Sequence, residues 1–195
     1  MRTLTIEQNI YSYSDLLLPE NSELKQKVLK NLSDINTDYD WYESVYYDFK
    51  TNIAPELGFK VDKIRFSGFY SQGDGAMFEG SVSDFTKFVS DTRIKRLIDN
   101  NNLDLSMEFK HVGNYSHERS YNAYLDNDIL EYDSHPNIMN YLDNLEKEIE
   151  EKYESTCKDL YRMLEKEYEY LESEEAILET IEANCYEFDS NGKIV

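Results

Sequence analysis

The densest group of residues that could do chemistry lies between Phe66 and Gly80, in the segment FSGFYSQGDGAMFEG. Glycines and small polar side chains there interrupt two hydrophobic stretches. Such a surface offers hydrogen-bond donors and acceptors beside exposed rings, which suits a ligand or the edge of another protein. We therefore predict that the segment contacts a partner through Ser67, Phe69, Tyr70, Gln72 and Asp74.

The same segment also has a structural interpretation. Gly73 and Gly75 would supply positive φ angles to a turn, and the Asp74 carboxylate would bond its own backbone. The segment lacks the lysine and the length of a phosphate-cradling loop, so the sequence predicts no nucleotide or other cofactor.

Three histidines, His111, His117 and His135, follow the glycine-rich segment. Their spacing matches none of the common metal-ligand patterns, so we expect surface histidines and no bound metal. A triad of Ser71, His111 and Asp74 would lack the GxSxG elbow of a hydrolase, and we expect no catalytic residue. A small enzyme that uses the SQGDGA surface with a histidine remains an alternative.

Side-chain alternation indicates the strands that must position this segment. A period of two from Val61 to Val82 predicts a β-hairpin with SQGDG as its turn. A cleaner alternation from Leu103 to Phe109 predicts a strand with one face on a core. The polar and aromatic stretch from Tyr115 to Leu125 predicts a fourth strand nearer the sheet edge, and a short strand is expected from Arg2 to Glu7.

Helical periodicity accounts for most of the remaining chain. The stretch from Glu20 to Leu32 predicts a first helix with one apolar face. A second helix, capped by Asp38 or Asp40, repeats an apolar residue every four positions. A third helix begins at the cap Ser83, with Asp91 and Thr92 as a point where it can be interrupted.

After Pro136, apolar residues recur every three or four positions as far as Leu171. This pattern predicts one helix about 50 Å long, and Ser173 caps a further short helix. The expected fold class is α+β: a small antiparallel sheet of about four strands packed with N-terminal helices, then a long acidic helix and a short terminal helix. We divide the chain into an α+β domain, residues 1–135, and a helical part, residues 136–195.

The apolar stripe of the long helix needs a partner. It either packs on the body or on the short helix that follows, or it self-associates as a homodimer.

The charge of the chain is strongly negative and unevenly distributed. Its formal net charge is −20; residues 60–120 hold 9 basic and 9 acidic side chains, whereas residues 121–195 hold 6 and 21. Such a field repels nucleic acid and anionic membranes and attracts basic proteins. Because there is no signal-peptide core, and Cys157 and Cys185 form no disulfide framework, we expect a protein of the host cell cytoplasm.

Carboxylates on the long helix, with one tyrosine, form the second predicted contact surface. Between Asp143 and Glu172 there are 11 acidic and 5 basic residues, a sparser charge than the one per about 1.7 Å of duplex DNA. DNA mimicry is therefore one version of the binding hypothesis and not its default. The helix residues expected to contact the partner are Glu146, Glu150, Glu154, Tyr161, Glu165 and Glu169.

Four segments together resemble a family of phage, prophage and plasmid proteins, some of which carry an antitoxin-like label. They are YSDLLLPE, DINTDYDWYESVYYDF, KIRFSGFYSQGDGAMFEG and SEEAILETIEANCYEFDSNGKIV, and the likeness covers most of the chain. The resemblance implies a mobile-element origin and no established reaction. Leu17, Leu18 and Pro19 depart from the usual short approach to the first helix.

Charge, resemblance and the lack of catalytic machinery favour a non-enzymatic inhibitor of the anti-CRISPR or anti-restriction type. Its expected partner is a basic nucleic-acid-binding protein, such as a host defence nuclease or effector. The alternative from the same interaction class is an antitoxin or regulator that neutralises a cationic toxin.

Overall fold

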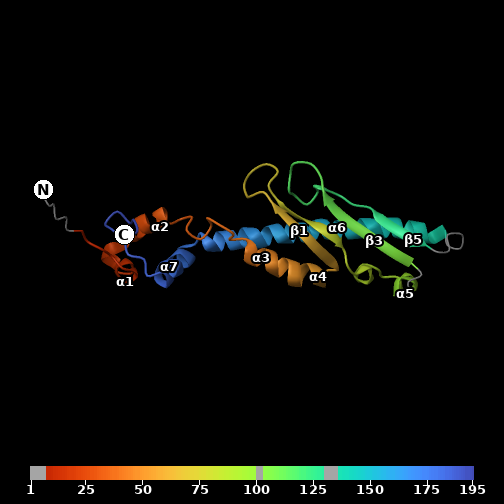
Figure 1. Ribbon diagram of the computed structural model, residues 1–195, viewed down its shortest axis with the longest axis horizontal. Coiled ribbons are helices and arrows are strands. Elements are labelled where there is room, and N and C mark those ends of the chain that lie inside the picture. The colour runs from red at the N-terminus through yellow and green to blue at the C-terminus, as the bar shows by residue number, and fades with distance from the viewer. Residues whose placement is uncertain (1–7, 100–102, 130–135) are drawn as a thin grey trace, which may run out of the picture. The chain divides into compact units, whose positions relative to one another are not determined.

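The computed structural model describes residues 8–99, 103–129 and 136–195 (Figure 1). The chain forms two compact units. Unit 1 comprises Met1–Tyr42 and Lys166–Val195, and unit 2 comprises Glu43–Glu165. The division that the sequence suggested after residue 135 stays a prediction, and its boundary lies outside the described residues.

Unit 2 is built on an antiparallel sheet in which β1 pairs with β2, β2 with β3, and β3 with both β4 and β5. The predicted hairpin and third strand are confirmed. The strands are β1 (Phe59–Phe66), β2 (Ala76–Val82), β3 (Leu103–His111), β4 (Tyr121–Asn122) and β5 (Leu125–Ile129).

The fourth strand begins later than predicted. Residues 112–120 form a loop, because Gly113 turns the chain at a φ of 79° and His111 Nε2 hydrogen-bonds the carbonyl oxygen of Tyr115 at 2.9 Å. Pairing with β3 starts only at Tyr121.

Helices cover one face of this sheet. They are α3 (Glu43–Asp48), the π-helical segment η2 (Phe49–Ile53), α4 (Ala54–Glu56) and α6 (Pro136–Leu171). The Tyr153 ring of α6 stacks on Phe109 with centroids 3.9 Å apart, and its hydroxyl donates to the carbonyl oxygen of Phe78 at 2.5 Å. The predicted apolar stripe is therefore buried on the body of unit 2, through Leu142, Leu145, Ile149, Tyr153, Cys157, Leu160 and Leu164.

The opposite face of β3 is exposed, as its alternation predicted. Leu103, Leu105, Met107 and Phe109 are buried, whereas the polar residues between them face outward. Both outer edges of the sheet are capped by charged side chains. Lys50 donates to the Asp62 carbonyl of β1 at 3.0 Å, and Glu146 accepts the Leu125 N–H of β5 at 2.8 Å. Such caps hinder another strand from pairing there.

Two of the predicted helix boundaries were wrong. The helix expected from Ser83 begins later, as η3 (Phe85–Lys87) capped by Asp84, and it is interrupted before α5 (Thr92–Asp99), at the point that Asp91 and Thr92 indicated. Asp84 and Asp91 each accept a backbone N–H two residues ahead. α3 begins only at Glu43. Asp40 therefore caps nothing, and its φ of 50° places it in a turn.

Unit 1 pairs a segment near the start of the described chain with one near its end, because Tyr11 and Phe188 exchange backbone hydrogen bonds. It contains α1 (Tyr13–Leu16), η1 (Pro19–Asn21), α2 (Ser22–Asn31), the end of α6 and α7 (Glu174–Ala183). Ser173 caps α7 as predicted, accepting the Ala176 N–H at 3.2 Å. α7 does not cover the α6 stripe, because its apolar face joins α1 and α2 in a core of Leu16, Leu24, Val28, Ile177, Ile181 and Phe188.

Two further expectations concerned a strand at residues 2–7 and helices that could cross a membrane. The strand predicted at residues 2–7 lies outside the described residues. Among the helices that the structure describes, none is both long and apolar enough to cross a membrane.

Candidate functional site

Two loops lie side by side at one end of the sheet of unit 2 (Figure 1). The 67–75 loop joins β1 to β2, and the 112–120 loop joins β3 to β4. Glycines allow their close approach. A Cβ on Gly73 would lie 2.3 Å from Cδ1 of Tyr115, and a Cβ on Gly75 would lie 2.7 Å from the His117 Cα.

The 67–75 loop is ordered by its own hydrogen bonds. Asp74 Oδ2 accepts the Ser71 N–H at 2.7 Å, and the Asp74 N–H donates to the Ser71 carbonyl at 3.1 Å. Gly73 has the positive φ that was predicted, 90°, but Gly75 does not. Gly75 is required for its small size, because a side chain there would collide with the backbone of His117. Tyr70, at a φ of 71°, is held in a conformation that bulky residues rarely adopt.

Two crossed ion pairs join the 112–120 loop to α6. Glu118 in the loop pairs with Lys158 on the helix at 3.6 Å, and the next residue, Arg119, pairs with Glu154 at 3.4 Å. The loop carries an acid and then a base, and the helix offers each of them an opposite charge. A shift of the loop by one residue would place Arg119 against Lys158 or Glu118 against Glu154, which are like charges. The two pairs therefore favour one register of the loop on the helix, although each pair is weak by itself.

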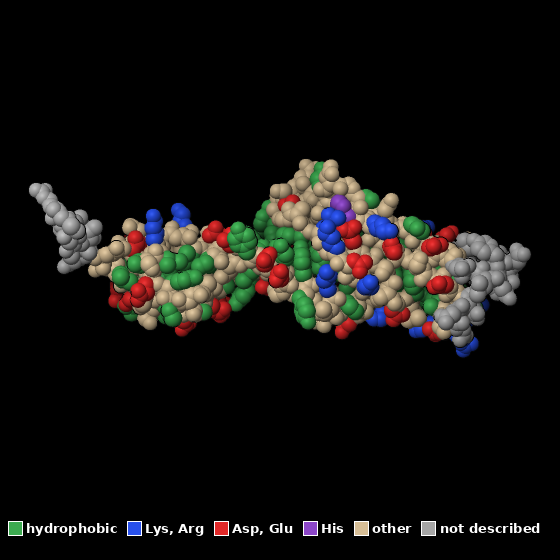
Figure 2. All heavy atoms as spheres, viewed as in Figure 1, with side chains coloured by type: hydrophobic (Ala, Val, Ile, Leu, Met, Phe, Trp, Pro, Cys, Tyr) green, Lys and Arg blue, Asp and Glu red, His purple; other side chains and the backbone are tan. Residues whose placement is uncertain are grey.

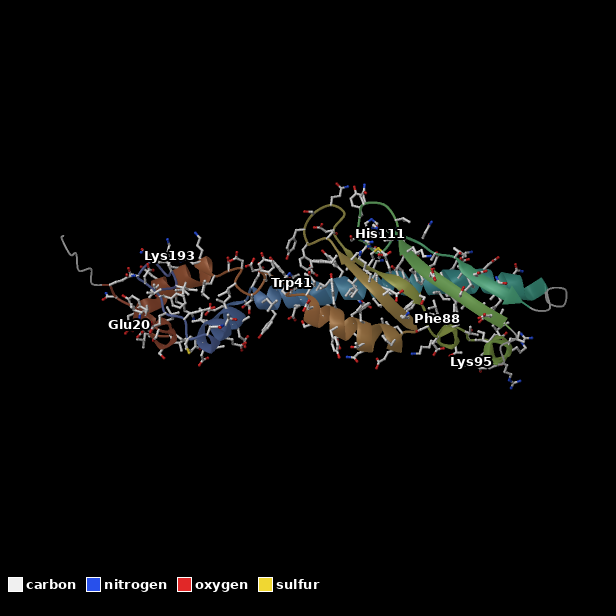
Figure 3. The ribbon with its side chains drawn as sticks, viewed as in Figure 1. Glu20, Trp41, Phe88, Lys95, His111 and Lys193 are labelled. Carbon is white, nitrogen blue, oxygen red and sulfur yellow. The ribbon has the colours of Figure 1, made fainter. Side chains whose placement is uncertain are left out.

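His111 and His117 form hydrogen bonds with the backbone of this loop. His111 bonds Tyr115 near the base of the loops (Figure 3), and His117 Nδ1 accepts the Arg119 N–H at 3.2 Å. Within the part of the chain that the structure describes, no three His, Cys, Asp or Glu side chains are placed to hold a metal ion. His135 lies outside the described residues.

Both loops carry the same short sequence, Gly-x-Tyr-Ser, at residues 68–71 and 113–116. In each, the glycine has a positive φ and the tyrosine side chain is exposed: Tyr70 to 82% and Tyr115 to 56%. Tyrosine, serine, glycine and asparagine are the residues that antibody loops use for protein contacts, because the rings add contact area at low entropic cost. We call Phe69, Tyr70, Gln72 and Tyr115 the two-loop surface.

Helix α6 packs against this surface through the ring of Tyr161. The Phe69 ring lies 6.0 Å from Tyr70 and 5.4 Å from Tyr161 of α6, measured between centroids. In the space-filling view, hydrophobic side chains gather at the base of the 67–75 loop, whereas acidic and basic side chains intermingle over the sheet (Figure 2).

One flank of α6 is acidic and runs from the 112–120 loop, where Glu154 pairs with Arg119, toward β5, where Glu146 accepts the Leu125 N–H. Glu146, Glu150 and Glu154 follow one another every four residues, and each is half-buried. Burial, and then the charges of Glu146 and Glu154, raise the pKa of Glu150. The exposed charged residues of α6 between residues 140 and 165 are balanced by contrast, with Asp143, Glu148, Glu151 and Asp159 against Lys147, Lys152, Lys158 and Arg162.

A small pocket of about 230 Å³ lies between the 67–75 loop and α6, and we call it the Tyr161 pocket. Burial raises the pKa of the Cys157 thiol to about 12, so this cysteine stays protonated at neutral pH and is a poor nucleophile. The lining residues are Asp74, Gly75, Ala76, Glu118, Cys157, Lys158, Tyr161 and Arg162.

The structure joins most of the residues predicted from the sequence. Asp74 and the rings of Phe69 and Tyr70 lie at the same flank of α6 as Tyr161, and Ser67 and Gln72 are exposed on the same loop. On α6 itself, Glu146, Glu150, Glu154 and Glu165 belong to unit 2, whereas Glu169 belongs to unit 1.

Sequence reasoning missed three residues: Tyr115, Glu118 and Arg119. The recurrence of Gly-x-Tyr-Ser could have indicated Tyr115. The partners of Glu118 and Arg119 lie 40 and 35 residues away on the helix, so no local pattern marks them.

Residues 41–174 match the model of a protein family described as a domain of unknown function, DUF8835. The match contains all of unit 2 and every residue of the two loops and the α6 flank. No curated protein and no solved structure matches the chain.

Proposed function

We propose that this chain, which belongs to the family of the domain of unknown function DUF8835, is a non-enzymatic inhibitor that binds a basic protein through the two-loop surface and the acidic flank of α6. The observation that carries the proposal is the pair of Gly-x-Tyr-Ser loops. Hydrogen bonds and ion pairs order both loops, and each presents an exposed tyrosine. Pre-ordered rings lose little entropy on binding and are typical of interface hot spots.

Charge supports a basic partner. Unit 1 holds 6 basic and 16 acidic residues and unit 2 holds 14 and 24, so each has a net charge of −10. Within unit 2, Glu154 pairs with Arg119 of the 112–120 loop, and Glu150 and Glu146 follow it along α6 toward β5. A surface that combines rings with carboxylates complements lysine and arginine on nucleic-acid-binding proteins.

The resemblance to mobile-element proteins supports the class of partner: a host defence nuclease or effector whose nucleic-acid groove the inhibitor occupies. The protein acts in the host cytoplasm under this proposal. We do not extend the proposal to dimerisation through α6, because its stripe from Leu142 to Leu164 is buried in unit 2.

Site-specific cross-linking in the bacterial host tests the proposal. A photoreactive phenylalanine analogue replaces Tyr70, and a control chain carries it at Tyr47 of α3, which is 70% exposed and outside the two-loop surface. We expect position 70, and not position 47, to cross-link a nucleic-acid-binding protein. Duplex DNA and 0.5 M salt should both reduce the product, because DNA competes for the same groove and salt screens the charges.

Two outcomes would contradict the proposal: the same product from both positions, or a product from position 70 that excess DNA does not diminish. A small cationic protein encoded beside this chain would instead support the antitoxin function.

A further inference from the structure

The Tyr161 pocket combines an aromatic ring with carboxylates. Tyr161 forms one wall and contacts Phe69, while Asp74 and Glu118 contribute carboxylates from the two different loops. Its volume of about 230 Å³ is enough for the end of one long side chain. The pocket adjoins the two-loop surface, because Tyr161 lines the pocket and its ring contacts Phe69.

The two cations that line the pocket are already paired. Lys158 lies 3.6 Å from Glu118, and Arg162 lies 3.1 Å from Asp159, which does not line the pocket. The Arg162–Asp159 pair is exposed and the Lys158–Glu118 contact is long, so each is weak and can exchange. These cations leave the Asp74 carboxylate without a cationic partner among the described residues.

The electrostatic surroundings of the pocket are negative despite these two cations. Burial raises the pKa of the Tyr161 hydroxyl, and the charges of Glu165 and Asp74 raise it further. At Cys157, burial is again the main cause of the raised pKa, and Glu118 and Glu154 add to it. Although the two carboxylates and two cations that line the pocket balance in charge, Asp74 makes no ion pair among the described residues, so an entering group with a positive charge can pair with it.

We propose that the Tyr161 pocket receives the guanidinium group of one arginine side chain of the partner protein. This inference rests on the proposed function and names the chemical group that the site recognises. A guanidinium is planar, stacks on aromatic rings and donates in pairs to carboxylates, and it gives up water more readily than an ammonium group does. The arginine stacks beside Tyr161 and takes the place of Lys158 on Glu118.

Lys158 acts in this arrangement as an internal competitor. Replacing it by methionine keeps the length of the side chain and frees the Glu118 carboxylate. Because an exposed ion pair of this kind is weak, we expect arginine to bind about two- to fivefold more tightly to the variant. Glu118→Gln removes the negative charge and the bidentate carboxylate, so it should weaken binding.

The test uses a small probe and needs no identified partner. The full chain labelled with ¹⁵N is titrated with Nα-acetyl-L-arginine N-methylamide at millimolar concentrations, and the amide signals of Gly75 and Tyr161 are followed. The citrulline analogue, which has the same shape and no charge, is the matched control ligand. Glu148→Gln is the control variant, because Glu148 is an exposed α6 carboxylate outside the pocket.

We expect the arginine probe to shift both signals, the citrulline probe to leave them in place, and Lys158→Met and Glu118→Gln to change the affinity in opposite directions. Equal shifts with citrulline, or no difference between Lys158→Met and Glu148→Gln, would overturn the assignment. If the probe fails but position 70 still cross-links a basic protein, only this inference is lost. If the probe binds and the cross-link fails, the pocket stands and the proposed function does not.

Discussion

The ring of Tyr161 on α6 lies 5.4 Å from the ring of Phe69 in the 67–75 loop. These residues are far apart in the sequence, and each was expected to contact a partner for a different reason, one for the loop and one for the helix. Their contact joins the loop surface and the helix surface, which were predicted separately, into one surface. It also brings the exposed Tyr70 into the same ring cluster as Tyr161 of α6, since Phe69 contacts both Tyr70 and Tyr161.

Close approach of the two loops depends on Gly75, which has an ordinary φ, so a substitution there is strained only by its neighbours. In Gly75→Ala the new Cβ meets the His117 backbone at 2.7 Å. We expect a loss of about 1–3 kcal/mol in the free energy of unfolding, measured by urea denaturation.

Gly113→Ala is the matched comparison, because Gly113 lies in the other loop with open space around it and a φ of 79°. Backbone strain alone should cost about 1–2 kcal/mol there, and loop contact should persist. If Gly75→Ala changed stability by less than about 0.5 kcal/mol, like an ordinary surface substitution, the loops would not be packed as described.

The crossed ion pairs should hold the 112–120 loop on α6 at low salt. A double-mutant cycle of Arg119→Ala and Glu154→Ala should give a coupling of about 0.2–1 kcal/mol, as exposed pairs do. In 1 M salt the coupling should vanish, because screening acts strongly on exposed charges. A coupling that is absent at low salt, or unchanged by salt, would argue against an electrostatic clip.

Glu150 should make stability depend on pH. Burial, Glu146 and Glu154 raise its pKa in the folded chain above the ordinary value of 4.5. Ionising Glu150 therefore costs the folded state more than the unfolded state. This cost is absent below the unfolded pKa and grows as the pH rises through the folded pKa.

We expect Glu150→Gln to be more stable than the parent at pH 7 and equal to it near pH 4, in thermal unfolding measured at both values. Each like-charge pair at this spacing costs about 0.2–0.5 kcal/mol, which sets the size of the gain. Glu148→Gln, at an exposed position, should show no comparable gain. A stabilisation of Glu150→Gln that is the same at both pH values would have another cause.

The fold was largely predictable because its strands and helices follow simple periods. β3 alternates buried and exposed residues without a break, and the α6 stripe repeats from Leu142 to Leu164. Both patterns are local consequences of burying one face. The predicted helix starts failed at Asp40 and Ser83, where a capping residue type was present but the backbone turned differently.

The site was predictable only in part. Residue types indicated Phe69, Tyr70 and Asp74, but Asp74 bonds the backbone of its own loop while also lining the pocket. Glu146, Glu150 and Glu154 of α6 were named from the sequence, but the elements that they lie against were not. Which carboxylates lie on the flank depends on how the helix rotates on the sheet, and the packing of Tyr153 on Phe109 fixes that rotation.

The affinity of the cross-linked partner for variants of the two-loop surface tests the central proposal most directly. The measurement is the dissociation constant of the purified partner for the parent, for Tyr70→Ala/Tyr115→Ala, and for Tyr47→Ala, with displacement of duplex DNA as a second signal. We expect the double variant to bind at least about 30-fold more weakly and to release no DNA, because hot-spot residues contribute about 2 kcal/mol or more, while Tyr47→Ala matches the parent. Equal dissociation constants for the double variant and Tyr47→Ala would contradict the proposal.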